Sequence, residues 1–331
     1  MRRREFIVLI GGAAVGWPLV VRAQESGRTY RLGVFIPSAR ESPQAAAFLD
    51  ELRLNGFVEG QNLTVIWADL GVSNNDALAE RAAALVKAAP DAIVAGPELP
   101  IRALQAITST VPILGVTEDM VGEALVASLA HPGGNTTGIS LLSPELDGKR
   151  QDILIEAAPG AQRIAAMAEA NVYFSPRDRH FQELQDAARK RGVEVSIIGV
   201  SGPGQIVPAI DAAKASGAKA LNFLASPLFS VPGSRNSRLV IERVAELRLP
   251  AIYQWPETAE VGGLLAYGPR FTQVYRQRGR MVAKVLRGIK PTDIPVEQPT
   301  SFELVVNVKT AKAIGHTVPA GLVLRADKVV E

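Results

Sequence analysis

Short apolar runs alternate with amphipathic segments along the chain from Tyr30 onward. The runs are continuous rather than alternately apolar and polar, which is typical of strands buried on both faces of a parallel sheet. The segments between them repeat apolar residues at helical spacing, and the longest predicts a helix over residues 272–287 that ends at Gly288. This repeated succession of strand and helix predicts an α/β fold built on parallel sheets. We expect strands at residues 31–36, 63–68, 92–95, 113–116, 137–141, 163–168, 193–199, 220–224, 251–253 and 264–267.

The second half of this pattern resembles the first. In both halves the first strand is followed by a Ser-Pro dipeptide, which begins at Ser42 in one and at Ser175 in the other. Further along, Pro97 and Pro227 occupy equivalent places, each between a predicted strand and a helix. We interpret the repeat as two similar Rossmann-like lobes. The alternative is that two unrelated α/β segments share these features by chance.

Residues 1–23 depart from the pattern. Three arginines at positions 2–4 precede an apolar stretch over residues 7–21, and the small residue Ala23 follows. The stretch is too short for a comfortable membrane span, and its charge, length and ending are typical of a bacterial export signal. The paired arginines favour the twin-arginine type. We therefore expect residues 1–23 to direct the protein to the periplasm, where it is either released by cleavage or stays membrane-associated through an uncleaved signal.

Composition narrows the possible functions. The 331 residues, 47% of them hydrophobic, are enough for two lobes with a substantial core. The net charge is +3, but the predicted export segment carries four arginines and one glutamate, so the remaining chain is near neutral. A near-neutral chain predicts no attraction to nucleic acid or to anionic lipid. The absence of cysteine excludes thiol catalysis, iron–sulfur clusters and thiolate metal sites.

The sequence lacks the catalytic and cofactor motifs that we sought. Residues 199–203 lack the final glycine of a nucleophile elbow, and residues 148–150 lack the upstream glycine and the hydroxyl residue of a phosphate-binding loop. The three histidines, His131, His180 and His316, are isolated and do not have metal-ligand spacing. We therefore expect no enzyme activity, no catalytic residues, no cofactor and no metal site.

The loops that follow the predicted strands are the expected place for a ligand. In open α/β sheets, ligands bind beyond the carboxyl ends of the strands, where loop amides and helix N-termini converge. Two facing lobes would enclose such loops in a cleft. We expect the ligand-binding residues to be Ser38, Arg40, Gly96, Pro97, Glu98 and Asp119 from the first lobe, and Tyr173, Ser226, Tyr253, Trp255, Tyr267 and Arg270 from the second.

Aromatic residues are scarce in the chain but recur in the loops of the second lobe. Flat aromatic walls suit a ligand with an apolar or aromatic body. Trp255 and Tyr253 are the strongest candidates, because they lie beside Pro256 in a predicted exposed loop. The alternative for each ring is that it caps the hydrophobic core at a strand end.

Polar residues in the same loops suggest how a carboxylate would be held. Ser38 and Ser226 stand near predicted helix N-termini, where hydroxyls and backbone amides bind anions. Arg40 and Arg270 could add charge-assisted hydrogen bonds. The alternative for each arginine is a solvated surface charge.

The acidic pair Glu118-Asp119 has several interpretations. Asp119 either caps a helix predicted over residues 121–130 or binds a ligand ammonium group together with Glu118, and these roles are compatible. An acid–base pair is a further possibility, although adjacent carboxylates are more often a cap or a solvated edge. The pair leaves the charge of the ligand open.

Several segments together resemble a known family. They cover residues 128–140, 249–253, 262–269, 295–307 and 324–327, and the likeness extends from about Tyr30 to the end of the chain. The sequence resembles the substrate-binding proteins of bacterial ABC transporters, which have the type I periplasmic binding fold. The most similar subgroup includes tryptophan- and phenylalanine-binding members.

The resemblance implies two lobes joined by three hinge crossovers, near residues 140–146, 267–270 and 295–303. Lobe one would then comprise residues 28–141 with 270–296, and lobe two would comprise residues 142–269 with 297–331. Hinges of this kind absorb backbone rotation at the ends of elements.

The resemblance also implies a function. The protein would capture an aromatic or amino-acid-like carboxylate by closure of the lobes and present it, as a monomer, to ABC permease subunits in the inner membrane. The family usually has an acid followed by proline where this chain has Asp119-Met120, and often an acid where it has Arg270. An arginine in place of an acid favours an anionic ligand over a zwitterion. The alternatives are a sensory protein that reports to a membrane kinase and a periplasmic α/β enzyme.

Overall fold

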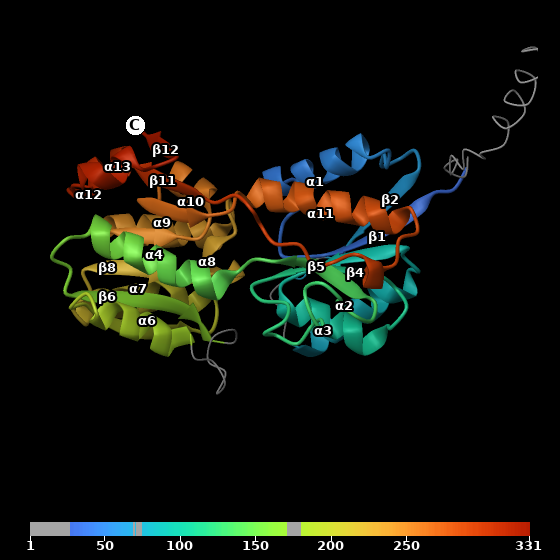
Figure 1. Ribbon diagram of the computed structural model, residues 1–331, viewed down its shortest axis with the longest axis horizontal. Helices are drawn as coiled ribbons and strands as arrows, with labels where there is room; N and C mark the ends of the chain where they lie inside the picture. The colour runs from blue at the N-terminus through green and yellow to red at the C-terminus, as the bar shows by residue number, and fades with distance from the viewer. Residues whose placement is uncertain (1–26, 69, 71–74, 171–179) are drawn as a thin grey trace, which may run out of the picture.

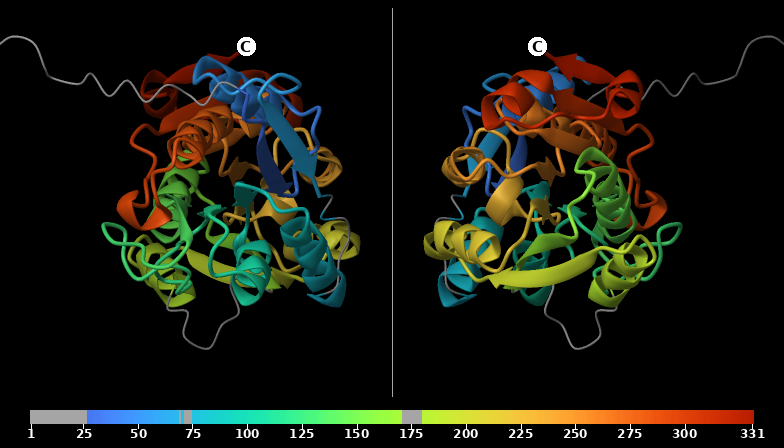
Figure 2. Two further views of the ribbon diagram at one scale, coloured as in Figure 1. Left: turned by 90° about the vertical axis from the view of Figure 1, so that its right-hand side faces the viewer. Right: turned by 90° about the vertical axis from the view of Figure 1, so that its left-hand side faces the viewer.

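The computed structural model describes residues 27–68, 70, 75–170 and 180–331, which form two α/β lobes side by side (Figure 1). The predicted export signal and Tyr173 lie outside the described residues. Each lobe has a central sheet with helices on both faces, as end-on views of the molecule show (Figure 2). The predicted two-lobe α/β fold is confirmed.

The sheet of lobe one is entirely parallel and has the strand order β2-β1-β3-β4-β5. Its strands are β1 (Tyr30–Phe35), β2 (Leu63–Trp67), β3 (Ala92–Ala95), β4 (Ile113–Thr117) and β5 (Thr136–Ser140). Its covering helices include α1 (Pro43–Leu54), α2 (Asn75–Lys87) and α3 (Glu98–Ile107). The apolar runs lie in this sheet because a strand covered on both faces by helices has no solvent side.

The sheet of lobe two repeats this order and then extends it. Its strand order is β7-β6-β8-β9-β10-β11-β12, of which the first five match the order in lobe one. The strands are β6 (Arg163–Glu169), β7 (Glu194–Val200), β8 (Ala220–Phe223), β9 (Ala251–Tyr253), β10 (Leu265–Gly268), β11 (Glu303–Asn307) and β12 (Lys328–Val330). The helices and short 3-10 turns of this half include α4 (Ser143–Ala157), α6 (His180–Arg189), η1 (Pro203–Gln205), α7 (Ile206–Ala215), α8 (Pro227–Ser230), α9 (Arg235–Glu246), α10 (Pro256–Glu260), α12 (Val308–Ile314) and α13 (Ala320–Leu324).

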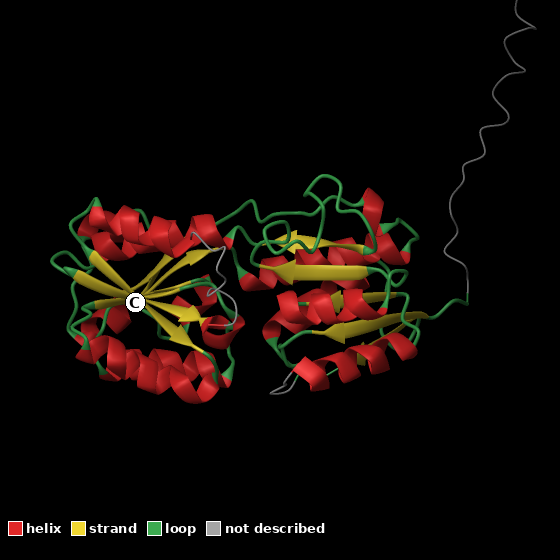
Figure 3. Ribbon diagram, turned by 90° about the horizontal axis from the view of Figure 1, so that it is seen from below, coloured by secondary structure: helices red, strands yellow, loops and turns green. Residues whose placement is uncertain are grey.

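The predicted strands agree with the first ten observed strands to within one residue at each end. The sequence did not predict β11 and β12. The pairing of β10 with β11 is antiparallel, unlike the other pairs between named strands of this sheet, because the chain returns from lobe one and enters the sheet in the reverse direction. Most arrowheads in each sheet point toward the other lobe, so the carboxyl ends of the strands face the gap between the lobes (Figure 3).

The chain crosses between the lobes three times: from β5 to α4, from β10 to α11 (Phe271–Leu286), and from η2 (Pro291–Asp293) to β11. Although α11 follows a strand of lobe two, it packs along α1 of lobe one (Figure 1). Gly279 permits this approach, because a Cβ atom there would lie 2.9 Å from Cβ of Glu51. No helix in the described part of the chain is long and apolar enough to cross a membrane.

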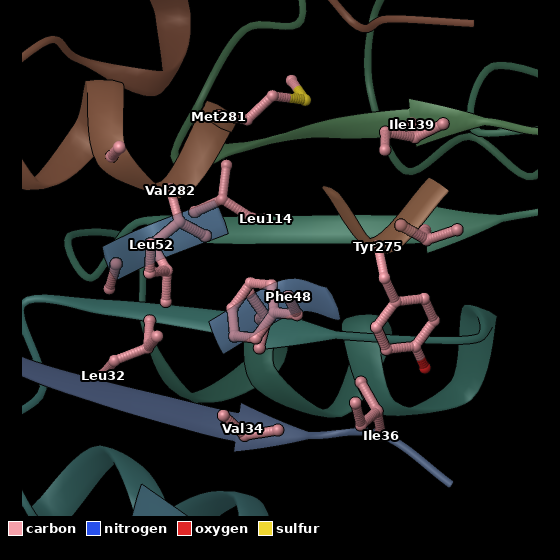
Figure 4. Packing of buried hydrophobic residues seen from close by; sticks show 14 of the residues in the cluster. Leu32, Val34, Ile36, Phe48, Leu52, Leu114, Ile139, Tyr275, Met281 and Val282 are labelled. Carbon is pink, nitrogen blue, oxygen red and sulfur yellow. The ribbon is translucent and has the colours of Figure 1, made fainter. Parts of the chain in front are cut away.

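One of the two core clusters of lobe one lies between this helix pair and the sheet, and the other lies on the side of α2 and α3. Phe48 and Leu52 of α1 and Val282 of α11 pack over the strand residues Leu32 and Leu114 (Figure 4). Tyr275 projects from α11 beside Ile36 in the same view. The helix therefore belongs to the packing of lobe one, and its first turns reach the end of β1.

The helix predicted over residues 121–130 is not present, so this prediction is wrong. The segment forms turns instead, and Ala124 has a left-handed φ of 52° that interrupts a helix. Asp119 accepts hydrogen bonds through Oδ1 from the amides of Val121 (3.1 Å) and Gly122 (2.9 Å). These are the hydrogen bonds that an N-cap aspartate makes, but here they stabilise a single turn.

Candidate ligand-binding site

The principal candidate site is a pocket between the two lobes, with about 480 Å³ of empty space that is partly open to solvent. It lies beyond the carboxyl ends of β1, β3 and β4 in lobe one and of β8 and β9 in lobe two, and side chains of α11 line one side. Its described lining residues are Ile36, Pro37, Ser38, Gly96, Pro97, Val116, Thr117, Glu118, Leu141, Ser226, Pro227, Val231, Gln254, Trp255, Phe271, Tyr275 and Arg278. Five of the residues expected from the sequence are thus brought together: Ser38, Gly96, Pro97, Ser226 and Trp255.

The lobe-one loops of the pocket are in direct contact at Gly96. A Cβ atom at this position would lie 2.4 Å from the carbonyl oxygen of Val116, so only glycine allows the loops after β3 and β4 to approach this closely. The peptide bond between Gly96 and Pro97 is cis. The close approach of the two loops at this end of the pocket therefore requires glycine at position 96.

Three buried aromatic rings form one wall of the pocket. The ring centroids of Trp255 and Phe271 are 4.5 Å apart, and those of Phe271 and Tyr275 are 4.9 Å apart. Trp255 belongs to lobe two, whereas Tyr275 lies on α11, so the wall joins elements from both sides. The sequence analysis nominated Trp255 but missed the other two, because on the apolar side of a helix they look like ordinary core residues.

Two other predicted aromatic residues pack elsewhere in lobe two. Tyr253 is buried and stacks on Phe223 with centroids 5.2 Å apart, and burial raises the pKa of its phenol above the usual range. Tyr267 stacks near Phe302. Neither is among the described residues that line the pocket. Their positions agree with the core-capping alternative.

The arginines nominated from the sequence are paired with carboxylates outside the pocket. Arg40 donates to Glu59 at 2.7 Å in an exposed ion pair. Arg270 donates to Glu260 and Glu303 at 2.9 Å each, and these hydrogen bonds raise the pKa of its guanidinium. Neither arginine is among the described lining residues. Both sit in ion pairs that join elements of the fold.

Arg278 is the arginine that the structure places in the pocket. Its side chain is 3% exposed, and Nη2 donates to the carbonyl oxygen of Ala95 at 3.5 Å. Its guanidinium carbon lies 5.0 Å from the centroid of the Tyr275 ring. Within the described part of the chain, Nε and Nη1 have no hydrogen-bond partner. Burial lowers the pKa of this guanidinium, and the nearby Tyr275 only partly opposes that effect.

A sequence signal for Arg278 did exist. It lies three residues after Tyr275 and four before Val282, so it falls on the buried stripe of α11. Arg276 and Arg280 flank it, and a run of alternating arginines looks like a solvated face. Helical spacing separates the buried arginine from its exposed neighbours.

The two predicted serines line the pocket with their hydroxyls already in hydrogen bonds. Ser38 Oγ lies 2.8 Å from Tyr275 Oη. Ser226 Oγ accepts from the amide of Leu228 at 3.0 Å and donates to the carboxylate of Glu169. Burial raises the pKa of Glu169, although its hydrogen bond with Ser226 opposes this. The Ser226 hydroxyl is therefore directed at a carboxylate of the chain itself.

Acidic residues lie at the lobe-one edge of the site. Glu118 lines the pocket and accepts a hydrogen bond at 3.4 Å from Gln254 of lobe two, which links the lobes across the cleft. Glu98 pairs with Arg102, and Asp119 lies in a separate hollow. The described residues contain no cluster of three or more histidine or acidic side chains that could hold a metal ion.

Glu123 lies in the segment after β4, close to Thr117. Burial raises the pKa of its carboxyl group to about 8. The hydrogen bond from Thr117 Oγ1 at 2.7 Å lowers it, while the charges of Glu98 and Glu118 raise it further. Glu123 is therefore largely protonated and neutral at pH 7, which keeps this buried group from adding a second negative charge beside Glu118.

Comparison with known proteins identifies a family whose members this chain resembles. A family model described as ABC transporter substrate binding protein matches residues 41–330. A tyrosine-binding protein from Clostridioides difficile is 26% identical over 272 residues, which is 81% of this chain and 75% of that protein.

Two solved structures share the fold. A conserved domain protein from Vibrio cholerae matches with a TM-score of 0.76 and 23% identity, over 91% of this chain and all of that one. An ABC domain from Streptococcus pneumoniae in complex with L-Trp matches with a TM-score of 0.75 and 20% identity, with the same coverage.

Proposed function

The chain belongs to the family of ABC transporter substrate-binding proteins, and we propose that it is the periplasmic receptor of an ABC importer. In this proposal, the protein works as a monomer outside the cytoplasmic membrane. It captures a small aromatic or amino-acid-like carboxylate between its lobes and delivers it to permease subunits in the inner membrane.

The shared pocket is the observation that carries this proposal. Its walls come from strand ends of both lobes, so rotation at the three crossovers would open it and closure would surround a ligand. Two features link the lobes in the arrangement described here. Gln254 donates to Glu118, and Trp255 packs in the same hydrophobic cluster as Val34 and Tyr275. A ligand that bridges these walls would favour the closed form, which a permease can distinguish from the open form.

The lining of the pocket supports an aromatic ligand. The wall of Trp255, Phe271 and Tyr275 offers flat apolar surface on which an aromatic ring can pack. The similar proteins include a tyrosine-binding protein and an ABC domain in complex with L-Trp, and both of these ligands are aromatic amino acids. A small molecule with one aromatic ring and a charged end fits these features.

A thermal-shift screen tests the proposal. The protein would be screened against L-tryptophan, L-tyrosine, L-phenylalanine and simple aromatic acids. A bound ligand should stabilise it by about 2.7 kcal/mol at a hundredfold excess over Kd. The variant Trp255→Ala should lose this gain, while Trp67→Ala, which alters a tryptophan outside the described pocket lining, should keep it. Absence of any shift with the unaltered protein would overturn the aromatic-carboxylate assignment.

A further inference from the structure

The guanidinium of Arg278 lies beside the Tyr275 ring but has no carboxylate partner among the described residues. It is 3% exposed, and it lines the pocket between the lobes. Its hydrogen bond to Ala95 uses only Nη2, at 3.5 Å, whereas Nε and Nη1 have no partner among the described residues. No acidic side chain in the described part of the chain pairs with it. A buried charge without a counter-ion costs stability unless something binds it.

The other side chains that the sequence suggested for binding an anion already have partners within the protein. Arg40 and Arg270 are held by glutamates outside the lining. Ser226 donates its hydroxyl hydrogen to Glu169. Among the described lining residues, Arg278 is the one cation and Glu118 the one carboxylate. Among the described side chains that line the pocket, Arg278 is therefore the one whose charge favours an anion.

We infer that Arg278 binds the negative charge of the captured solute, so that the ligand carries a carboxylate seated on this guanidinium, of which Nε and Nη1 have no partner among the described residues. This inference rests on the proposed function, because it takes the pocket between the lobes as the ligand site. The planar guanidinium offers two pairs of N–H donors, Nε with Nη2 along one edge and Nη1 with Nη2 at its end, and each pair matches the two oxygens of a carboxylate. The ligand supplies the counter-ion that the chain lacks.

The position of Arg278 on α11 also sets how such a ligand would lie. Tyr275 precedes it by three residues and Phe271 by seven, so all three side chains share one face of the helix. A carboxylate on Arg278 would leave an attached ring beside Tyr275, Phe271 and Trp255. The charge and the aromatic wall thus select the same class of molecule, an aromatic carboxylate.

The first test compares acids with their amides on the unaltered protein by isothermal titration calorimetry. The probes are L-tryptophan and L-tyrosine with their primary amides, and phenylacetate with phenylacetamide. Each acid should bind at least tenfold more tightly than its amide, because the amide places no charge on the guanidinium. Equal binding of acid and amide would overturn this inference and leave the proposed function standing. No binding of any probe would overturn both.

The second test alters the residue itself. Arg278→Met should weaken binding of the acids about 100-fold and leave binding of the amides nearly unchanged. Arg278→Lys should recover part of the loss, since it keeps the charge but not the paired donors. Arg280→Met, on the exposed side of the same helix, is the matched control and should bind like the unaltered protein.

A stability measurement separates this role from a purely structural one. Without ligand, Arg278→Met should melt at the same temperature as the unaltered protein or higher, because it removes a buried charge with no partner. A strongly lowered melting temperature together with unchanged acid affinity in Arg278→Lys would overturn the inference. The acid–amide comparison decides the matter even where the methionine variant folds poorly.

Discussion

Two buried arginines in this molecule have opposite surroundings. Arg150 of lobe two is fully buried, forms an ion pair with Asp147 and donates to the carbonyl oxygen of Tyr267 at 3.1 Å. Asp147 in turn accepts from the amide of Ala225 at 3.2 Å. Arg278 is almost as buried but has no carboxylate partner among the described residues. The comparison separates a charge that the fold neutralises from one that it leaves for a ligand.

The ion pair between Arg150 and Asp147 has a structural role in lobe two. Through Asp147 it holds the end of β8, and through Arg150 it holds the end of β10, where the chain crosses to α11. These strand ends support Ser226 and the crossover beside the pocket. Arg278 lies on the far side of that crossover and supports no other element through an ion pair in the described part of the chain.

The largest expected effect comes from breaking the lobe-two pair. Arg150→Met should lower the free energy of unfolding by about 3–5 kcal/mol, because it leaves the Asp147 carboxylate buried without its counter-ion. Chemical denaturation followed by circular dichroism measures this. The control is Arg189→Met, which removes an exposed ion pair with Asp186 and should change stability by less than about 1 kcal/mol.

The double variant Asp147→Asn with Arg150→Met sharpens the result. With both charges removed, much of the lost stability should return, since the cost lies in the unpaired charge and not in the missing arginine. If Arg150→Met were no more harmful than Arg189→Met, the contrast between a neutralised arginine and an unpaired one would not hold.

The same contrast exists between two carboxylates. Burial without a cationic partner raises the pKa of Glu123 in lobe one to about 8. Burial also acts to raise the pKa of Glu260 in lobe two, but hydrogen bonds from Arg270 and Lys328 outweigh it and lower the pKa below its usual value. Glu260 is paired with cations, as Arg150 is paired with Asp147, whereas burial without such a pair keeps Glu123 near the pocket largely neutral.

These shifts predict opposite dependences of stability on pH. In the unfolded chain Glu123 ionises near its usual pKa of about 4.3, so between there and about 8 the folded state binds the extra proton. Stability should therefore fall as pH rises through this interval, by up to about 1.4 kcal/mol per pH unit from this group. The stabilising contribution of Glu260 is present above its unfolded pKa and is lost as pH falls through its folded pKa.

Urea denaturation at pH 5, 6.5 and 8 measures the first of these effects. Glu123→Gln keeps the neutral hydrogen-bonding shape and should remove its share of the decline between pH 5 and 8. Glu260→Gln should leave that decline in place. A variant Glu123→Gln with the same pH profile as the unaltered protein would contradict the assignment of a neutral buried acid beside the pocket.

The sequence predicted the sheets better than the site. Strands buried on both faces are continuous apolar runs, so ten of them could be placed from local pattern alone. β11 was missed because it pairs antiparallel with β10 after a crossover, and this pairing depends on the three-dimensional path of the chain. The helix expected after Asp119 was wrong because the turn that this aspartate begins ends at Ala124, whose left-handed φ of 52° interrupts a helix.

The strand-end rule found the part of the pocket that is made of loops. It placed Ser38, Gly96 and Trp255 in the lining, because a parallel sheet brings such loops together. It could not find Arg278, which is supplied by a helix after the second crossover. Nor could it show that Arg270 pairs with Glu303, which is 33 residues away in the sequence. Whether an arginine is paired depends on tertiary packing, and local sequence does not contain that information.

The smallest expected effect concerns the contact between the lobes. Gln254→Ala removes the hydrogen bond to Glu118, which at 3.4 Å is long and should contribute only about 0.5 kcal/mol. The ratio of closed to open ligand-free protein should therefore fall about twofold, which a larger radius of gyration in small-angle X-ray scattering would report. Binding of a carboxylate to Arg278 should restore the compact form, because the ligand contacts both walls.

A matched glutamine tests whether this change comes from the interface between the lobes. Among the described residues, Gln105 donates within lobe one, to the carbonyl oxygen of Leu125 at 2.8 Å and to Thr136 at 2.9 Å. Gln105→Ala should lower the melting temperature yet leave the radius of gyration unchanged. Gln254→Ala should instead increase the radius of gyration and leave the melting temperature nearly unchanged. Equal radii for both variants would mean that the bond between Gln254 and Glu118 does not bias closure. The lobes would then be held together by the packing of Trp255 against lobe one and by the bound ligand.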